Sequence, residues 1–245
     1  MNHGMRLSLV AVILALGMIL SAALVSKLFV RLRHEQAIKV KGYAEQDVTS
    51  DIGKFNCACS VRGVSLQEAH DKLQASRNRV QAYLQQEQFP GADIIVQPIQ
   101  ITKVVKRDAQ GKVTNEIQYY DLMQRIAVTS SNVAAIRDVS IAISTLIKEG
   151  IDIGVMPPEF YVSTLPVTKL ELLAKATDDA YRRAVVLAEN SRGRVGALIS
   201  ARQGVLQITA RHSTDTSGYG VYDTATIEKT AKAVVTLEYA IEPVR

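Results

Sequence analysis

An uncharged apolar run from Leu7 to Ser26 comes before any alternating pattern in this chain. A helix rises about 1.5 Å per residue, so a run of this length crosses the roughly 30 Å hydrocarbon core of a bilayer. A cleaved signal peptide has a shorter apolar core, of about 7–15 residues, followed by small residues. Ser21-Ala22-Ala23 could serve as such a cleavage site, but the apolar run continues past it. We therefore expect residues 1–35 to form a retained transmembrane anchor.

Residues 36–245 read as one folded domain in which strand and helix patterns are interleaved. Period-two alternation of apolar and polar residues predicts strands at 38–45, 52–61, 94–106, 118–129, 195–209 and 226–241. The first two are predicted to pair with each other. An extended segment at 151–165 is broken by Pro157-Pro158, which is typical of an edge strand.

Three helical patterns separate these strands, at 66–88, 132–148 and 168–193. The first and third open with capping boxes, in which a hydroxyl and a carboxylate satisfy free backbone N–H groups. The third repeats a small or apolar residue every four positions, which lets a helix backbone approach a sheet closely: Leu172, Ala176, Ala180, Ala184 and Ala188. The order ββαββαβαββ predicts an α+β fold, with helices packed on a largely antiparallel sheet.

The charge of the chain is concentrated beside the apolar run. Residues 1–41 carry six basic side chains and one acidic side chain, which accounts for the whole net charge of +5. A neutral folded part is a poor match for nucleic acid, whose phosphates supply most of the binding affinity. The basic residues Lys27, Arg31 and Arg33 instead suit anionic lipid headgroups. Counted by the positive-inside rule, this flank would place the folded part in the cytoplasm.

The motif search predicts a protein that is not an enzyme and holds no cofactor or metal. The sequence has no nucleotide-binding glycine loop, no nucleophile elbow and no ligand-spaced histidines. Cys57 and Cys59 lie two residues apart on a predicted strand, which separates their Cβ atoms by about 6–7 Å. A disulfide needs about 3.8 Å, so we interpret the pair as two buried core residues. A thiol-based redox role is the alternative.

A long segment at 211–224 joins the last two predicted strands. A connection of this length without secondary structure is usually functional or mobile. Its glycines, serines and tyrosines suit adaptable contacts with another protein. We take Tyr219, Tyr222 and Asp223 as candidate partner-contact residues, with a plain mobile loop as the alternative.

Several short stretches in order resemble one known family. They are Val40-Lys41-Gly42-Tyr43-Ala44, then Ala176-Thr177-Asp178-Asp179-Ala180-Tyr181-Arg182-Arg183-Ala184, Leu187-Ala188, Gly193 and Gly196, and Tyr222-Asp223-Thr224 through Glu228-Lys229 to Val234. From about Val40 onward the chain resembles the SIMPL domain family (DUF541). That family includes bacterial envelope proteins of the outer-membrane-protein 28 and oxidative-stress-defence type. The resemblance carries over no catalytic residue.

The resemblance implies an α+β domain exported to the periplasm of a Gram-negative bacterium. It also implies frequent self-association and a role in envelope integrity or stress tolerance. Our first hypothesis is a non-catalytic scaffold or binding module in the inner membrane, facing the periplasm and forming a homo-oligomer. The alternatives are a redox protein that uses Cys57 or Cys59, and a tethered adaptor that faces the cytoplasm.

Overall fold

The computed structural model describes residues 17–18, 21, 37–87, 89, 94–215 and 217–243. Most of the expected anchor at 7–26 lies outside these residues, as do the basic residues Lys27, Arg31 and Arg33. Among the residues that are described, no helix has both the length and the apolar character needed to cross a bilayer.

The chain divides into two compact units. Unit 1 comprises Met1–Ala44, Glu171–Val205 and Ala233–Arg245, and unit 2 comprises Glu45–Leu170 and Leu206–Lys232. Two long strands and one long helix contribute residues to both units: β1 (Ala37–Thr49), β10 (Glu228–Pro243) and α4 (Leu165–Asn190). Each unit is described by itself below.

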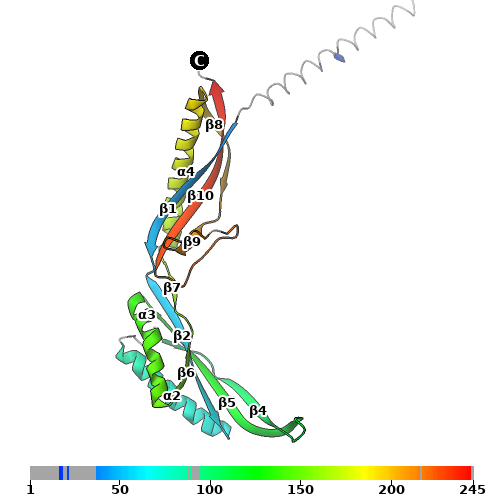
Figure 1. Cartoon of the computed structure of the whole chain (residues 1–245), viewed down its shortest axis with the longest axis vertical. Coiled ribbons are helices and arrows are strands. Elements are labelled where there is room, and N and C mark those ends of the chain that lie inside the picture. Colours follow the sequence, from blue (N-terminus) through cyan, green and yellow to red (C-terminus); the bar gives the residue numbers. More distant parts are fainter. Residues whose placement is uncertain are drawn as a thin grey trace, which may run out of the picture. The chain divides into compact units, whose positions relative to one another are not determined.

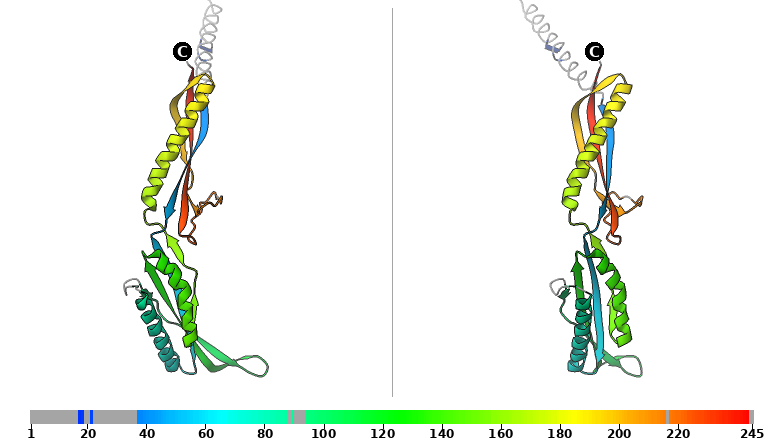
Figure 2. Two further views of the ribbon diagram at one scale, coloured as in Figure 1. Left: turned by 60° about the vertical axis from the view of Figure 1, so that its left-hand side comes forward. Right: turned by 90° about the vertical axis from the view of Figure 1, so that its left-hand side faces the viewer.

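Unit 1 packs one helix against one face of a three-stranded arrangement. Strand β10 lies between β1 and β8 (Gly193–Gln203), and α4 runs along the same three strands in every view (Figures 1 and 2). The alanines of α4 predicted to face the sheet are completely buried. A Cβ atom added to Gly42 of β1 would lie 2.0 Å from the carbonyl oxygen of Ala176. The small residues on both sides are therefore what allows the helix to lie so close.

Unit 2 is built around β2 (Ile52–Gly63) and β5 (Val113–Ser130), which pair antiparallel from Gly53 to Gly63 of β2. Strand β5 also pairs with β3 (Ile94–Val96) and β4 (Gln100–Arg107), while β2 pairs with β6 (Asp152–Val155) and β7 (Glu159–Tyr161). Strand β9 (Gln207–Ala210) pairs with the start of β10.

The helices of unit 2 cover one face of this sheet. They are α2 (Leu66–Gln86), α3 (Val133–Ala142) and the 3-10 helix η2 (Ile143–Glu149). Cβ atoms added to Gly53 and Gly63 of β2 would meet Ile136 of α3 and Ala69 of α2 respectively. Both helices therefore pack on the odd-numbered face of β2, and the core between them includes Phe55, Leu73, Leu84, Leu122, Ile126, Ile136 and Leu146.

The α+β class and the antiparallel pairing are confirmed, but the expected pairing of the first two strands is wrong. Strand β1 pairs with β10, and β2 pairs with β5, β6 and β7. Only Ser50 and Asp51 separate β1 from β2, and their backbone N–H groups donate to Ile227 O and Tyr161 O. Because these two hydrogen bonds hold the connection to other segments, the chain does not turn back on itself to form a hairpin.

One of the two expected capping boxes is present. The Ser65 hydroxyl accepts from the backbone N–H of Glu68, and the Glu68 carboxylate accepts from that of Val64. The box expected at residues 168–171 is wrong because α4 begins at Leu165. The Thr168 hydroxyl instead donates to Thr164 O, within the first turn of the helix.

Candidate functional site

The β4–β5 hairpin extends past the rest of the sheet of unit 2. Strand β2 ends at Gly63, opposite Tyr120 of β5. Beyond that point β5 pairs only with β4 in the described part of the chain, through register partners such as Val104↔Tyr119 and Arg107↔Val113. Figure 1 shows this two-stranded ribbon continuing beyond the end of β2. We call residues 104–119 the hairpin arm.

The tip of the hairpin arm closes in a tight turn at residues 108–112. The Asp108 carboxylate accepts from the backbone N–H groups of Gln110 and Lys112, and Gly111 takes a positive φ of 80°. That left-handed conformation suits glycine because it has no Cβ atom. The arm is therefore an ordered hairpin with a defined turn.

The hairpin arm exposes apolar side chains that a monomer does not cover. Val113 is 55% exposed and Ile117 is 38% exposed, and Ile101 beside the root of the arm is 52% exposed. A two-stranded hairpin is only marginally stable in water without a surface to pack on. A partner surface that packed on the arm would therefore bury these apolar side chains.

The root of the hairpin arm is held by a cluster on the open face of the sheet. Arg62, near the end of β2, forms an ion pair with Asp121 of β5 at 3.2 Å. Its guanidinium carbon also lies 5.2 Å from the centre of the Tyr119 ring, within the range of a cation–π contact. The hydrogen bond to Asp121 raises the pKa of Arg62 above its ordinary value. Together these contacts fix where the arm leaves the sheet.

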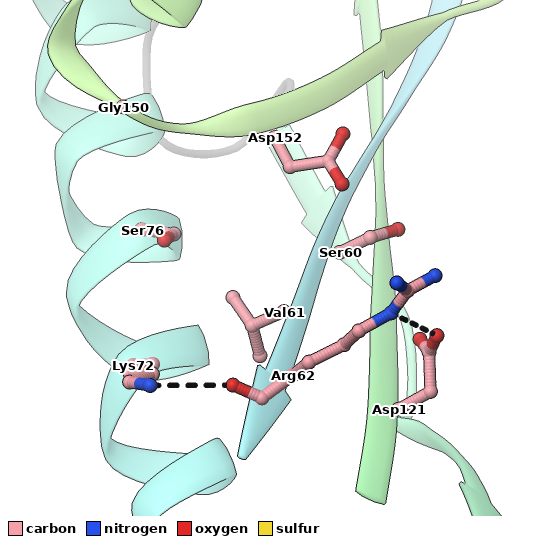
Figure 3. A pocket seen from close by; sticks show the side chains of 8 residues that line it. All are labelled: Ser60, Val61, Arg62, Lys72, Ser76, Asp121, Gly150 and Asp152. Carbon is pink, nitrogen blue, oxygen red and sulfur yellow. Dashed lines mark hydrogen bonds and ion pairs between the residues drawn. The ribbon is translucent and has the colours of Figure 1, made fainter. Parts of the chain in front are cut away.

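A polar cleft of about 530 Å³ lies next to this root (Figure 3). Lys72 of α2 donates to Arg62 O at 3.3 Å and to Glu68 at 2.7 Å. Ser60 and Asp152 are register partners on β2 and β6, on the same face as the Arg62 side chain. The cleft is lined by Ser60, Val61, Arg62, Lys72, Ser76, Asp121, Gly150 and Asp152.

The lining of this cleft contains both basic and acidic side chains. Both of its cations, Arg62 and Lys72, already contact carboxylates, and it has no histidine in its lining. Within the described residues, no group of three or more potential ligands is placed to hold a metal ion. The cleft can therefore accept small polar groups.

Comparison with known protein families now assigns the chain. The family model SIMPL, a protein of unknown function (DUF541), matches residues 38–239. This chain belongs to the SIMPL family. The match covers both units and confirms the resemblance at the level of the family, while the outer-membrane-protein 28 type stays a prediction. Comparison with curated proteins finds no match.

The two cysteines of this SIMPL domain lie in the core of unit 2. Cys57 and Cys59 are each 1% exposed and neither forms a disulfide. Burial, followed by the nearby Cys59 thiol, raises the pKa of Cys57 to about 12. Burial and the charge of Asp152 raise the pKa of Cys59 to about 11. The prediction of two buried core residues is confirmed, and neither thiol has the accessible, low-pKa character that redox chemistry requires.

The structure gives the three candidate contact residues of the long segment different surroundings. Tyr219 is fully exposed. Tyr222 forms an isolated bridge with Ile208, and its ring centre lies 6.3 Å from that of Tyr161. The Asp223 carboxylate is engaged inside the chain, where it accepts from the backbone N–H of Ala225. Of the three side chains, only that of Tyr219 is presented entirely to solvent, and its partner role stays a prediction.

Sequence reasoning missed the buried lysine that anchors this segment. Lys229 is completely buried, and its ammonium donates to the main-chain oxygen of Asp223 at 2.6 Å and lies 3.4 Å from the Asp223 carboxylate. Burial lowers the pKa of Lys229, although the Asp223 charge opposes this effect. The period-two pattern of β10 carried the signal, because Lys229 falls in phase with the buried residues Ala231 and Ala233.

Proposed function

We propose that this SIMPL protein is a non-catalytic module that is anchored in the bacterial inner membrane and associates with further copies of itself through the hairpin arm. The arm carries this proposal, because it places Val113 and Ile117 on a two-stranded ribbon with no helix or third strand along it in the described part of the chain. A second copy that covered these side chains would bury apolar area that is now in water.

Side-chain contact is a better description of this association than strand addition. One open edge of the arm is formed by β4, which carries Lys106 and Arg107 there, and the other is the part of β5 that lies beyond the end of β2. Cations on an edge strand discourage pairing with an identical edge, because like charges would face each other. Of these cations, Lys106 is paired within the arm to Glu116 at 2.9 Å. The proposed contact therefore uses the apolar side chains of the arm.

Membrane anchoring favours a second copy as the partner. An anchor at residues 7–26 would confine the chains to a plane, and confinement raises the effective concentration of one copy around another. The family resemblance also implies frequent self-association, a periplasmic location and a role in envelope integrity. The flanking charges favour the cytoplasm instead. A topology reporter fused after Arg245 decides between the two, since an enzyme active only in the periplasm gives signal in one orientation alone.

Cysteine cross-linking in intact membranes tests the association. We expect full-length Ile117→Cys to form a disulfide-linked dimer under mild oxidation. Cys57 and Cys59 are buried, so they give little background. The matched control is Ile141→Cys on α3, which is 70% exposed in the same unit but lies away from the arm in the sequence and the sheet. Equal cross-linking of the two variants would contradict the proposal.

A charge placed in the same position gives the complementary test. We expect Ile117→Asp to lower the mass of the detergent-solubilised full chain, measured by light scattering, while Ile141→Asp leaves it unchanged. The reason is that burying an unpaired carboxylate in a contact is strongly unfavourable. A full chain that is already monomeric at all concentrations would overturn self-association.

A further inference from the structure

A second candidate site lies in unit 1, between the start of β1 and the later turns of α4. It is a groove of about 590 Å³ lined by Lys39, Val40, Lys41, Arg182, Arg183, Val186 and Leu187. Val186 and Leu187 are 57% and 50% exposed, so the apolar part of the groove is open to solvent. Long basic side chains can keep their aliphatic stems against an apolar surface while their charged ends stay in water.

The rim of the groove has an excess of positive charge. Arg182 pairs with Asp178 at 2.9 Å and Arg183 pairs with Asp179 at 2.8 Å. Lys39 and Lys41 are exposed, and neither forms an ion pair with any residue that the structure describes. The groove thus combines an apolar floor with two cations that have no carboxylate partner in the described part of the chain.

The groove also lies close in sequence to the expected membrane anchor. Residues 27–36 are the only ones between the end of that anchor at Ser26 and the start of β1 at Ala37. Fully extended, they span at most about 35 Å. In Figure 1 the beginning of β1 and the last turns of α4 lie at the same end of unit 1. Both walls of the groove therefore belong to the end of unit 1 that follows the anchor directly.

We propose that this groove holds an anionic phospholipid of the bilayer in which the chain is anchored. The phosphate would lie at the ammonium groups of Lys39 and Lys41, and the first acyl carbons would lie on Val186 and Leu187. The inference rests on the membrane anchoring proposed above and is independent of self-association. A zwitterionic lipid lacks the net negative charge that two unpaired lysines select, and a second copy of this chain would need an acidic segment at this position.

A fluorescent probe in the groove tests this proposal on the full chain. Val186→Cys is labelled with an environment-sensitive fluorophore and reconstituted into vesicles of phosphatidylglycerol or of phosphatidylcholine, each with brominated acyl chains as quencher. Leu198→Cys is the matched control, because Leu198 is 52% exposed in the same unit but lines a different hollow with Arg202 as its cation. Flotation of the vesicles first shows whether the chain is anchored at all.

We expect quenching of the Val186 probe in phosphatidylglycerol only, and weaker quenching of the Leu198 probe in both lipids. The double variant Lys39→Gln/Lys41→Gln should reduce the affinity for phosphatidylglycerol about 30-fold, since each lysine near an anionic surface contributes roughly a factor of five. Equal quenching in the two lipids, or quenching unchanged by the double variant, would overturn the proposal. The proposal would also be overturned if the signal of the Val186 probe changed with the density of protein in the vesicles and not with the lipid. A second copy of the chain would then be the occupant of the groove.

The readouts keep the two proposals separate. A chain that does not float with vesicles removes both the anchor and the lipid groove. A chain that floats and cross-links through the hairpin arm, but shows no lipid-specific quenching at Val186, retains the proposed function and loses only the groove. Conversely, lipid-specific quenching without cross-linking supports the groove and contradicts self-association.

Discussion

The close approach of α4 to β1 makes Gly42 the most sensitive small residue of unit 1. A Cβ atom at this position would lie 2.0 Å from Ala176 O and 2.7 Å from both the Cβ and the backbone nitrogen of Ala180. Real Cβ atoms essentially never approach other atoms closer than 3.0 Å. None of these atoms ends a flexible side chain, so in Gly42→Ala the helix itself must move by about 1 Å or more.

The expected cost follows from two opposing terms. Forcing an extra methyl group into a well-packed interface costs about 1–3 kcal/mol. Replacing glycine in a strand recovers up to about 1 kcal/mol, because the unfolded chain loses freedom. The shift of α4 also disturbs the hydrogen bond from the Tyr43 backbone N–H to Asp179 at 2.9 Å. We therefore expect Gly42→Ala to lower the free energy of unfolding of unit 1 by about 2 kcal/mol.

Thermal unfolding of the detergent-solubilised full chain, followed by far-UV circular dichroism, measures this loss. Hydrogen exchange of the α4 amides assigns it to unit 1. The matched control is Gly154→Ala in β6, where an added Cβ atom meets nothing within 4 Å and we expect no loss. Adding Ala180→Gly should rescue Gly42→Ala only partly, because the contact with Ala176 O remains. Equal stability of the Gly42 and Gly154 variants would refute the close approach.

Three further outcomes follow from unit 2. Cys57 and Cys59 should resist maleimide until the chain is denatured, since burial raises both pKa values, and rapid labelling of the native protein would contradict their burial. Ser65→Ala should lower the free energy of unfolding by about 1 kcal/mol and speed hydrogen exchange in the first turn of α2, because it removes the cap. Asp223→Asn should cost about 3 kcal/mol at neutral pH by leaving the buried Lys229 without its carboxylate. Burial alone would raise the pKa of Asp223, but its hydrogen bonds and the Lys229 charge hold the pKa below the ordinary value of 3.8. The difference in the free energy of unfolding between wild type and Asp223→Asn, measured by urea denaturation, should therefore disappear as the pH falls below that value.

The existence of most elements could be predicted from the sequence because it depends on local pattern. The four-residue repeat of α4 is confirmed, and so is the buried alternation of β1 and β10, except that Ile38 and Ile241 at the outer ends are only half-buried. The start of α4 was missed because Thr168 and Glu171 imitate a cap. The actual first turn contains Pro166, and a proline that lacks an N–H is well tolerated there.

Strand pairing could not be predicted in the same way, because it depends on contacts between distant residues. The period-two pattern of 38–45 and 52–61 is satisfied equally well by a hairpin and by two separate sheets. The two arrangements differ in the acceptors of the two backbone N–H groups that connect the strands. Ser50 donates to Ile227, which follows it by more than 170 residues, and Asp51 donates to Tyr161. No local pattern encodes either acceptor.

The candidate contact surface on the hairpin arm was harder to predict from the sequence than the fold was. The arm exists because β5 has 18 residues and β2 has 12, so β5 continues where its partner has ended. The polar residues Thr114, Asn115 and Glu116 hide this continuation, and the pattern therefore predicts a strand that begins near Gln118. Val113 and Ile117 therefore fall outside the predicted strand, and the end of β2 at Gly63 leaves them uncovered. If assembly depends on this mismatch, extending β2 past Gly63 should protect the arm and abolish association, whereas substitutions in the core should change stability alone.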